Sequence, residues 1–166
     1  MVAPVWMPAY VGMGSNIDDP PRQLDRATAA LARLEATRLV AVSSYFRNPP
    51  FGPVRQPDFV NAVAALLTQL PPVELLAALQ RIEREHGREP SPGLRWGPRV
   101  LDLDLLVFGG LRLTQTGLVL PHPGIAQRNF VLLPLAEIAP GLDVPGLGQV
   151  SDLLGHVDQA GMERLA

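Results

Sequence analysis

The order of two kinds of apolar spacing is the strongest constraint on how this chain can fold. Residues 18–34 and 71–87 repeat apolar side chains at helical intervals, which predicts two amphipathic helices. Four segments rich in branched, aromatic or alternating apolar residues predict strands, at 9–15, 38–48, 58–70 and 101–108. The chain therefore reads strand, helix, strand, strand, helix, strand. This order favours an α+β fold, a ferredoxin-like βαββαβ sandwich with an antiparallel sheet and both helices on one side.

Local signals refine these boundaries. Asp19 precedes Pro20 and is expected to cap the first helix, and Gly87 is expected to end the second. After the core we expect a C-terminal extension with a short hairpin in 109–120, a short helix in 121–140 and one more helix in the tail. Residues 48–58 and 88–98 are too rich in proline and glycine for regular structure, which favours functional loops.

Composition excludes several classes of protein. The 166 residues, 47% hydrophobic and 18% charged, predict one domain over residues 1–166. The chain has no cysteine, which rules out disulfides and thiolate chemistry, and no lysine, which rules out a Walker A loop. A net charge of −2 without a basic run argues against nucleic acid as a partner. With no signal peptide or long apolar run, we expect a cytoplasmic protein that does not bind membranes and is a monomer.

Two aspartates interrupt the apolar strand at 101–108. Asp102 and Asp104 are two residues apart, so both carboxylates project from one face of an extended chain. One interpretation is a half-exposed strand face. The other is a hard-oxygen site for Mg²⁺, because Arg88, Arg95 and Arg99 in the preceding loop could bind the same phosphates as the metal. Metal and arginine together indicate phosphoryl-transfer chemistry.

Four other features allow two interpretations each. The turn GMGSN at 12–16 lacks the third glycine of a dinucleotide-binding loop, so a tight strand-to-helix turn is favoured. Trp96 could plug its own loop or form an aromatic wall for a planar ligand. Asn61, on the strand face of Phe59, could be satisfied by backbone or could bind the edge of a heterocycle. His122, between two prolines, could be structural or could join Arg128 and Phe130 at a phosphate site.

Taken together, these segments resemble the 6-hydroxymethyl-7,8-dihydropterin pyrophosphokinase family. The resemblance runs from GMGSN through SSYFRNPPFGPVRQPDFVNAV, LLAALQRIEREHGR and RWGPRVLDLDLLVFG to LPHPGIAQRNFVLLPLAEIAP, and RWGPRVLDLD is its most specific part. It implies transfer of pyrophosphate from ATP to a pterin alcohol with release of AMP, in folate biosynthesis. It also implies that both proline-rich loops close over the substrates.

The resemblance also implies roles for individual residues. It assigns two Mg²⁺ ions to Asp102 and Asp104, and the transferring group to Arg88 and Arg99. The residues implied to bind the pterin are Asn48, Pro49, Phe51, Phe59, Asn61, Trp96 and Phe130. The residues implied to bind ATP are Gln80, Glu83, Arg88, Arg99, His122 and Arg128.

The chain departs from the family pattern at two places. EPSPG follows Arg88 where further basic residues are common, and Pro123 stands where an aromatic residue is common, so ATP affinity and loop closure are the properties affected. Two other functions stay open from the residues alone. One is a Mg²⁺-dependent nucleotide phosphohydrolase, and the other is a non-catalytic ferredoxin-like module that binds a small ligand.

Overall fold

An antiparallel sheet forms the centre of the computed structural model, which describes residues 5–50, 52–87 and 98–165. Its strands, in spatial order, are β10 (Glu163–Arg164), β3 (Phe46–Asn48), β4 (Phe59–Thr68), β1 (Met7–Ser15) and β5 (Asp102–Phe108). A sixth strand, β2 (Thr37–Val42), pairs with β4 beside β3. Every pairing in this sheet is antiparallel.

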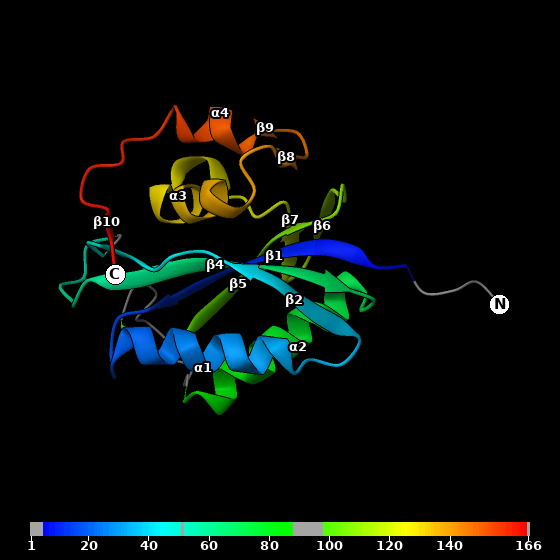
Figure 1. The fold of residues 1–166 in the computed structure, drawn as a ribbon, viewed down its shortest axis with the longest axis horizontal. Helices are drawn as coiled ribbons and strands as arrows, with labels where there is room; N and C mark the ends of the chain where they lie inside the picture. The colour runs from blue at the N-terminus through cyan, green and yellow to red at the C-terminus, as the bar shows by residue number, and fades with distance from the viewer. Residues whose placement is uncertain (1–4, 51, 88–97, 166) are drawn as a thin grey trace.

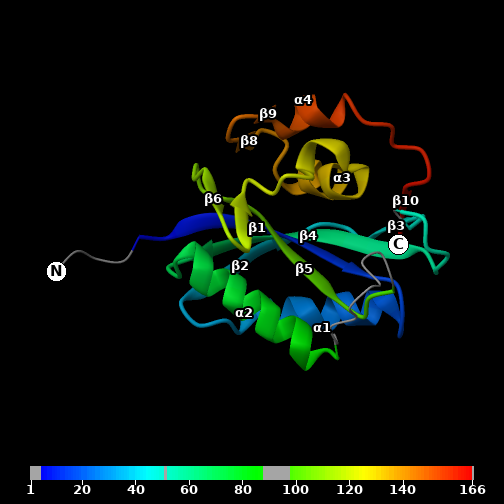
Figure 2. The same ribbon diagram turned by 180° about the vertical axis from the view of Figure 1, so that it is seen from behind.

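Helices cover both faces of the sheet (Figures 1 and 2). One face carries α1 (Pro20–Ala32) and α2 (Pro72–Glu85), and the other carries α3 (Asn129–Ile138) and α4 (Val150–Leu154). The remaining elements are the hairpin of β6 (Leu113–Gln115) and β7 (Leu118–Leu120), the turn η1 (Ile125–Gln127), and the pair β8 (Asp143–Val144) and β9 (Gly148–Gln149). The first two helices lie on one side of the sheet, as the sequence predicts.

Strand alternation divides the buried side chains into two cores. On β4, Ala62 and Ala64 belong to the core under α1 and α2, whereas Val63 belongs to the core under α3. Leu24 of α1 and Leu79 of α2 are fully buried in the first core. Each such leucine contributes about 1.5–3 kcal/mol through removal of its apolar surface from water. No helix in the described ranges is long and apolar enough to cross a membrane.

Most predicted elements are confirmed, but the segment 38–48 is two strands and not one. Ser43 is the reason, because its amide donates to the carbonyl of Val63 (2.9 Å) while its Oγ accepts from the amide of Val63 (2.9 Å). A side-chain oxygen thus replaces a backbone carbonyl in the ladder. The next amide, of Ser44, donates to Glu137 on α3 (2.6 Å), so the chain leaves the sheet before β3 begins.

The predicted cap of the first helix is wrong in its mechanism. Asp19 has a left-handed backbone (φ 64°) and its side chain makes no capping hydrogen bond. Instead Gln23 donates from its side chain to the carbonyl of Asp18 (2.8 Å) and from its amide to that of Asp19 (3.1 Å). The prediction for the other helix is confirmed, since α2 ends at Glu85 and Gly87 has a φ of 86°.

Candidate active site

Three neighbouring strands bring the predicted pterin and metal residues to one end of the sheet. Gly14 on β1 is paired with Asn61 on β4 at one side and with Asp102 on β5 at the other. Gly12 is likewise paired with Asp104 of β5. Residues directly opposite each other in antiparallel strands point to the same face, so the amide and both carboxylates share the face that α3 partly covers.

Glycine at position 14 leaves the space that Asn61 occupies. A Cβ on Gly14 would lie 2.6 Å from Asn61 Oδ1, well inside contact distance. The Asn61 amide is also held from its other end, because its Nδ2 donates to Asn48 Oδ1 (2.5 Å). Both asparagines are buried, with 8% and 5% of their surface exposed. Their mutual bond fixes the orientation of the Asn61 amide, and its Oδ1 faces the gap over Gly14.

The two aspartates lie on the face predicted for them. Leu103, between them in sequence, is buried in the core on the opposite face. Arg99 Nε lies 3.8 Å from Asp102 Oδ1, and their side chains are 16% and 32% exposed. Glu83 of α2 is buried, and its Oε2 accepts a hydrogen bond from the amide of Leu103 (2.9 Å). The carboxylate of Glu83 therefore anchors the strand that carries both aspartates.

Asn16 joins the bases of two loops. Its Nδ2 donates to Gln56 Oε1 (2.9 Å) and to the carbonyl of Pro57 (3.0 Å), both in the loop before β4. The backbone amide of Asn16 donates to the carbonyl of Arg99 (3.0 Å), and the backbone amide of Arg99 donates to Asn16 Oδ1 (2.8 Å). Asn16 is only 2% exposed. The turn GMGSN is thus a structural clasp, in agreement with the favoured interpretation of that motif.

A pocket of about 310 Å³ lies beside β5 and joins Asp104 to His122. The other side chains and backbone atoms that line it come from Leu76, Leu103, Leu105, Gly117, Leu118, Val119 and Pro123. Apolar residues make up most of this set, and Asp104 and His122 are its titratable members. Such a lining suits a flat, partly apolar group that carries a charged tail.

His122 is held neutral in this environment. Burial, and secondarily the positive charge of Arg128, lower the pKa of His122 from 6.5 to about 4. Its Nδ1 accepts a hydrogen bond from the amide of Gly124 (3.0 Å), so Nε2 carries the proton and is a donor. The Arg128 side chain packs where a Cβ on Gly124 would lie, and its guanidinium stands 5.8 Å from the centre of the Phe130 ring.

Some predicted residues lie apart from this group. Gln80 is exposed on α2, outside the set that lines the pocket in the described part of the chain. Pro49 is exposed just after β3. Phe51, Arg88 and Trp96 lie outside the described residues, as does the predicted closure of the loop at 88–97.

The sequence did not identify several residues that shape the site. The sequence pattern places Gly14 and Asn16 only in a turn, whereas the structure explains glycine opposite Asn61 by packing. Leu76 and Leu118, which line the pocket, fall only within the predicted helix at 71–87 and the predicted hairpin in 109–120. These residues come together only when segments that are distant in sequence meet in the fold, and no local pattern contains that information.

Comparisons with known proteins agree on one family. A family model described as 7,8-dihydro-6-hydroxymethylpterin-pyrophosphokinase (HPPK) matches residues 10–140. The 2-amino-4-hydroxy-6-hydroxymethyldihydropteridine pyrophosphokinase of Pseudomonas aeruginosa is 49% identical over 156 residues, which are 94% of this chain and 95% of that protein. The protein of the same name from Haemophilus influenzae is 44% identical over 146 residues, which are 88% of this chain and 90% of that protein.

Solved structures support the same fold. The crystal structure of wild-type Plasmodium falciparum HPPK-DHPS with pteroate matches 96% of this chain with a TM-score of 0.75 and 11% identity. This chain spans about half the length of that protein, 48%. At such low identity the likeness shows the arrangement of helices and strands alone.

Proposed function

The chain belongs to the 7,8-dihydro-6-hydroxymethylpterin-pyrophosphokinase family, and from this premise we propose how its residues divide the reaction between them. The chain is an ATP-dependent diphosphotransferase that moves pyrophosphate from ATP to the hydroxymethyl group of 6-hydroxymethyl-7,8-dihydropterin, in folate biosynthesis. The observation that carries the proposal is the row formed by Asn61, Gly14 and Asp102, which sets a buried side-chain amide and a half-buried carboxylate on one sheet face.

The pterin is proposed to bind on the β4 side of this row. The orientation of the Asn61 amide is fixed by Asn48, which leaves Oδ1 to accept from the amino and amide edge of the ring. Phe59 lies two residues earlier on the same strand face, and Phe130 lies in the first turn of α3. Both are proposed as aromatic walls. Pro49, Phe51 and Trp96 keep the pterin-binding roles that the resemblance implies.

The metal is proposed to bind at Asp102 and Asp104. The donor set fits magnesium, because two half-buried carboxylates on one face leave the remaining positions to water and phosphate oxygens. No cluster of three or more acidic, histidine or cysteine ligands occurs among the described residues, so ATP itself would complete the shell. Magnesium held there would neutralise phosphate charge during transfer. Two ions are proposed, as the resemblance implies.

ATP is proposed to bind with its base in the pocket beside β5 and its phosphates over the aspartates. The apolar lining around Leu118 would contact the base, and neutral His122 would donate from Nε2 to a phosphate oxygen. Arg128 would add a charged donor beside it. Glu83 is proposed to act through its bond to the amide of Leu103, and Gln80 keeps its implied contact with ATP.

For the chemical step we propose in-line attack of the hydroxymethyl oxygen on the β-phosphorus, with AMP as leaving group. Arg99 lies next to Asp102. Together with Arg88 it would stabilise the negative charge that develops on the leaving oxygen. The chain supplies position and charge and forms no covalent bond to phosphorus. Closure of the two proline-rich loops would exclude water and so prevent hydrolysis of ATP.

We further propose that the core is ferredoxin-like, with the residues after β5 as a C-terminal extension and residues 1–166 as one domain. The sheet order supports this class, because β2 and β3 stand beside β4, then β1, then β5. A monomer in the cytoplasm remains our proposal.

One incubation separates the three candidate functions. The chain is mixed with ATP and Mg²⁺, with and without 6-hydroxymethyl-7,8-dihydropterin, and nucleotide products are resolved by chromatography. AMP that appears only with the pterin supports the pyrophosphokinase. Inorganic phosphate released without the pterin would support the phosphohydrolase, and no product in either mixture would support the binding module.

A further inference from the structure

The last strand of the chain pairs with the strand that presents Asn48. In β10, Glu163 is opposite Arg47 and Arg164 is opposite Phe46, so the edge of β3 is covered. Arg47 and Glu163 also form an exposed ion pair at 3.6 Å. A strand of two residues is too short to be held by pairing alone, and an exposed ion pair adds little stability.

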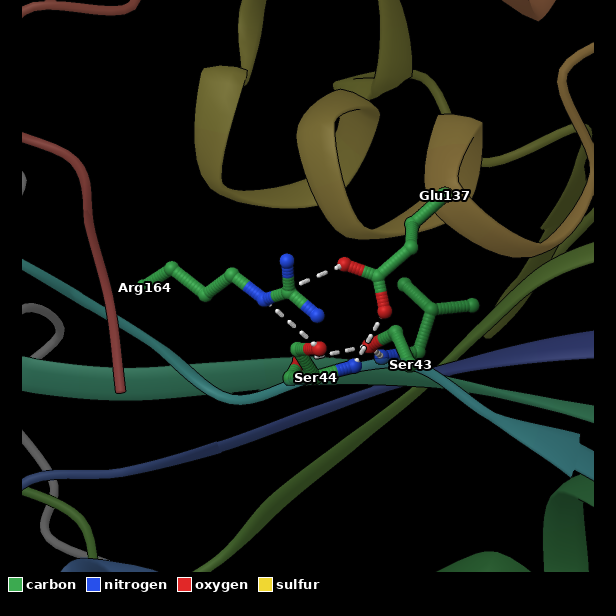
Figure 3. A network of polar contacts seen from close by, with 5 residues as sticks. Ser43, Ser44, Glu137 and Arg164 are labelled. Atoms are coloured by element: carbon green, nitrogen blue, oxygen red, sulfur yellow. Dashed lines mark hydrogen bonds and ion pairs between the residues drawn. The ribbon is translucent and has the colours of Figure 1, made fainter. Parts of the chain in front are cut away.

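Further contacts hold β10 in place (Figure 3). Arg164 Nε donates to Ser44 Oγ (3.0 Å) and lies 4.0 Å from Glu137 Oε2 on α3. The other oxygen of Glu137 accepts from the amide of Ser44 (2.6 Å). Beyond Arg164, the backbone amide of Leu165 donates to the carbonyl of Tyr45 (2.8 Å). The Leu165 side chain packs on the core under α1 and α2. The C-terminal strand is thus tied to both β3 and α3.

The segment before β10 contacts both sides of the proposed pterin pocket. On the β3 side, Gly161 packs on Pro49, since a Cβ on Gly161 would lie 3.2 Å from Pro49 Cδ. On the α3 side, Asn129 Nδ2, next to Phe130, donates to the carbonyl of Asp158 (2.8 Å). Between these contacts the turn is held by a hydrogen bond from the amide of Ala160 to Asp158 Oδ1 (2.8 Å).

We infer that residues 158–165 are a positioning element for the pterin, which sets the separation between the Asn48 side and the Phe130 side of its pocket. The inference rests on the proposed function. β3 and α3 belong to different layers of the molecule, and the hydrogen bond from the Ser44 amide to Glu137 joins them before β3 begins. The segment adds a second connection, which runs from Pro49 just after β3 to Asn129 beside Phe130. Gly161 is the most restricted position of the segment, since its φ of 83° and its contact with Pro49 both disfavour any side chain.

The test compares two glycine substitutions at positions that both have a positive φ. Gly161→Ala adds a methyl group that meets Pro49, whereas Gly148→Ala adds one at φ 110° with no atom within 4 Å. Affinity for the pterin is measured by calorimetry with a saturating non-hydrolysable ATP analogue, and affinity for the analogue is measured alone. We expect pterin affinity to fall about tenfold in Gly161→Ala, or about 1.4 kcal/mol, with unchanged analogue affinity. Gly148→Ala should change neither affinity.

A second variant acts at the other end of the segment. Asn129→Ala removes the hydrogen bond to Asp158 without changing any contact of β3. It should also lower the affinity for the pterin and leave the affinity for the ATP analogue unchanged. Unchanged pterin affinity in both Gly161→Ala and Asn129→Ala, or an equal loss of pterin and analogue affinity, would overturn the inference. A wild-type chain that binds the analogue but no pterin would instead refute the proposed function.

Discussion

The Gly14→Ala variant tests whether the side-chain amide of Asn61 binds the edge of the pterin ring. Gly14 has an ordinary strand backbone, since its φ is not among the positive values of the described glycines, so Ala itself is not disfavoured there. The added Cβ would lie 2.6 Å from Asn61 Oδ1 and 3.9 Å from Phe59 Cδ1. The methyl group thus meets the atom that is proposed to accept from the ring.

The cost follows from what Asn61 must give up. To move away by several tenths of an ångström, the buried amide has to stretch or break its bond to Asn48, which costs about 0.5–1.5 kcal/mol of stability. A misplaced Oδ1 leaves polar groups of the bound ring without a partner, which costs about 1–3 kcal/mol of affinity. We expect pterin affinity to fall about 5- to 150-fold, with little change in ATP affinity.

Gly12→Ala is the matched control. It lies on the same strand and the same face, but its Cβ would stand 3.5 Å from Leu106 Cδ2, an ordinary contact. Thermal unfolding of both variants and calorimetry for the pterin, with a non-hydrolysable ATP analogue present, measure the two costs separately. If Gly14→Ala bound the pterin as tightly as Gly12→Ala does, Asn61 would not be the residue that hydrogen-bonds to the ring.

Three more predictions concern the metal, the clasp and the histidine. Asp104→Asn should reduce turnover by at least about 100-fold while the free energy of unfolding stays equal or rises, because repulsion between like charges is relieved; near-normal turnover would exclude the metal site. Asn16→Ala should cost about 1–3 kcal/mol of stability and speed hydrogen exchange at the Arg99 amide, and unchanged exchange would contradict the role of the clasp. The imidazole of His122 should titrate near pH 4 by NMR in the free chain. Because this pKa lies below the unfolded value of 6.5, the stability contributed by neutral His122 is complete above pH 6.5 and is lost as the pH falls toward 4. A midpoint near 6.5 would show that burial and Arg128 do not perturb it.

The parts of the fold that follow from local pattern were predictable. The spacing of Leu75, Leu79 and Ile82 identifies the buried face of α2, and all three are buried. The alternation of Asp102 and Asp104 with leucines predicts a strand with both carboxylates on one face, which their pairing with Gly14 and Gly12 of β1 confirms. These features depend on residues within one or two turns of each other, so the sequence contains the whole signal.

The parts that depend on distant partners were not predictable. The break after β2 needs Val63, which lies 20 residues from Ser43, and Glu137, which lies 93 residues from Ser44. Similarly, β10 has no strong strand pattern of its own and exists through its contacts with β3 and α3. Asp19 likewise has a left-handed backbone where its residue type favours a capping side chain, and the Gln23 side chain donates to the carbonyl of Asp18 instead.

The row through Gly14 also fixes the distance between the backbones at Asn61 and Asp102. Asn61 and Asp102 are opposite the same glycine, so their backbones are separated by two strand spacings, about 9.5 Å. Hydrogen bonding between strands fixes this interval, and no side chain on β1 intrudes into it. The length is comparable to a two-ring heterocycle with a one-carbon arm, so a substrate held at its far edge by the amide would extend its hydroxyl toward the carboxylates. In the proposed binding mode the sheet backbone would select the size of the substrate, and substitutions in the surrounding loops would not alter this interval.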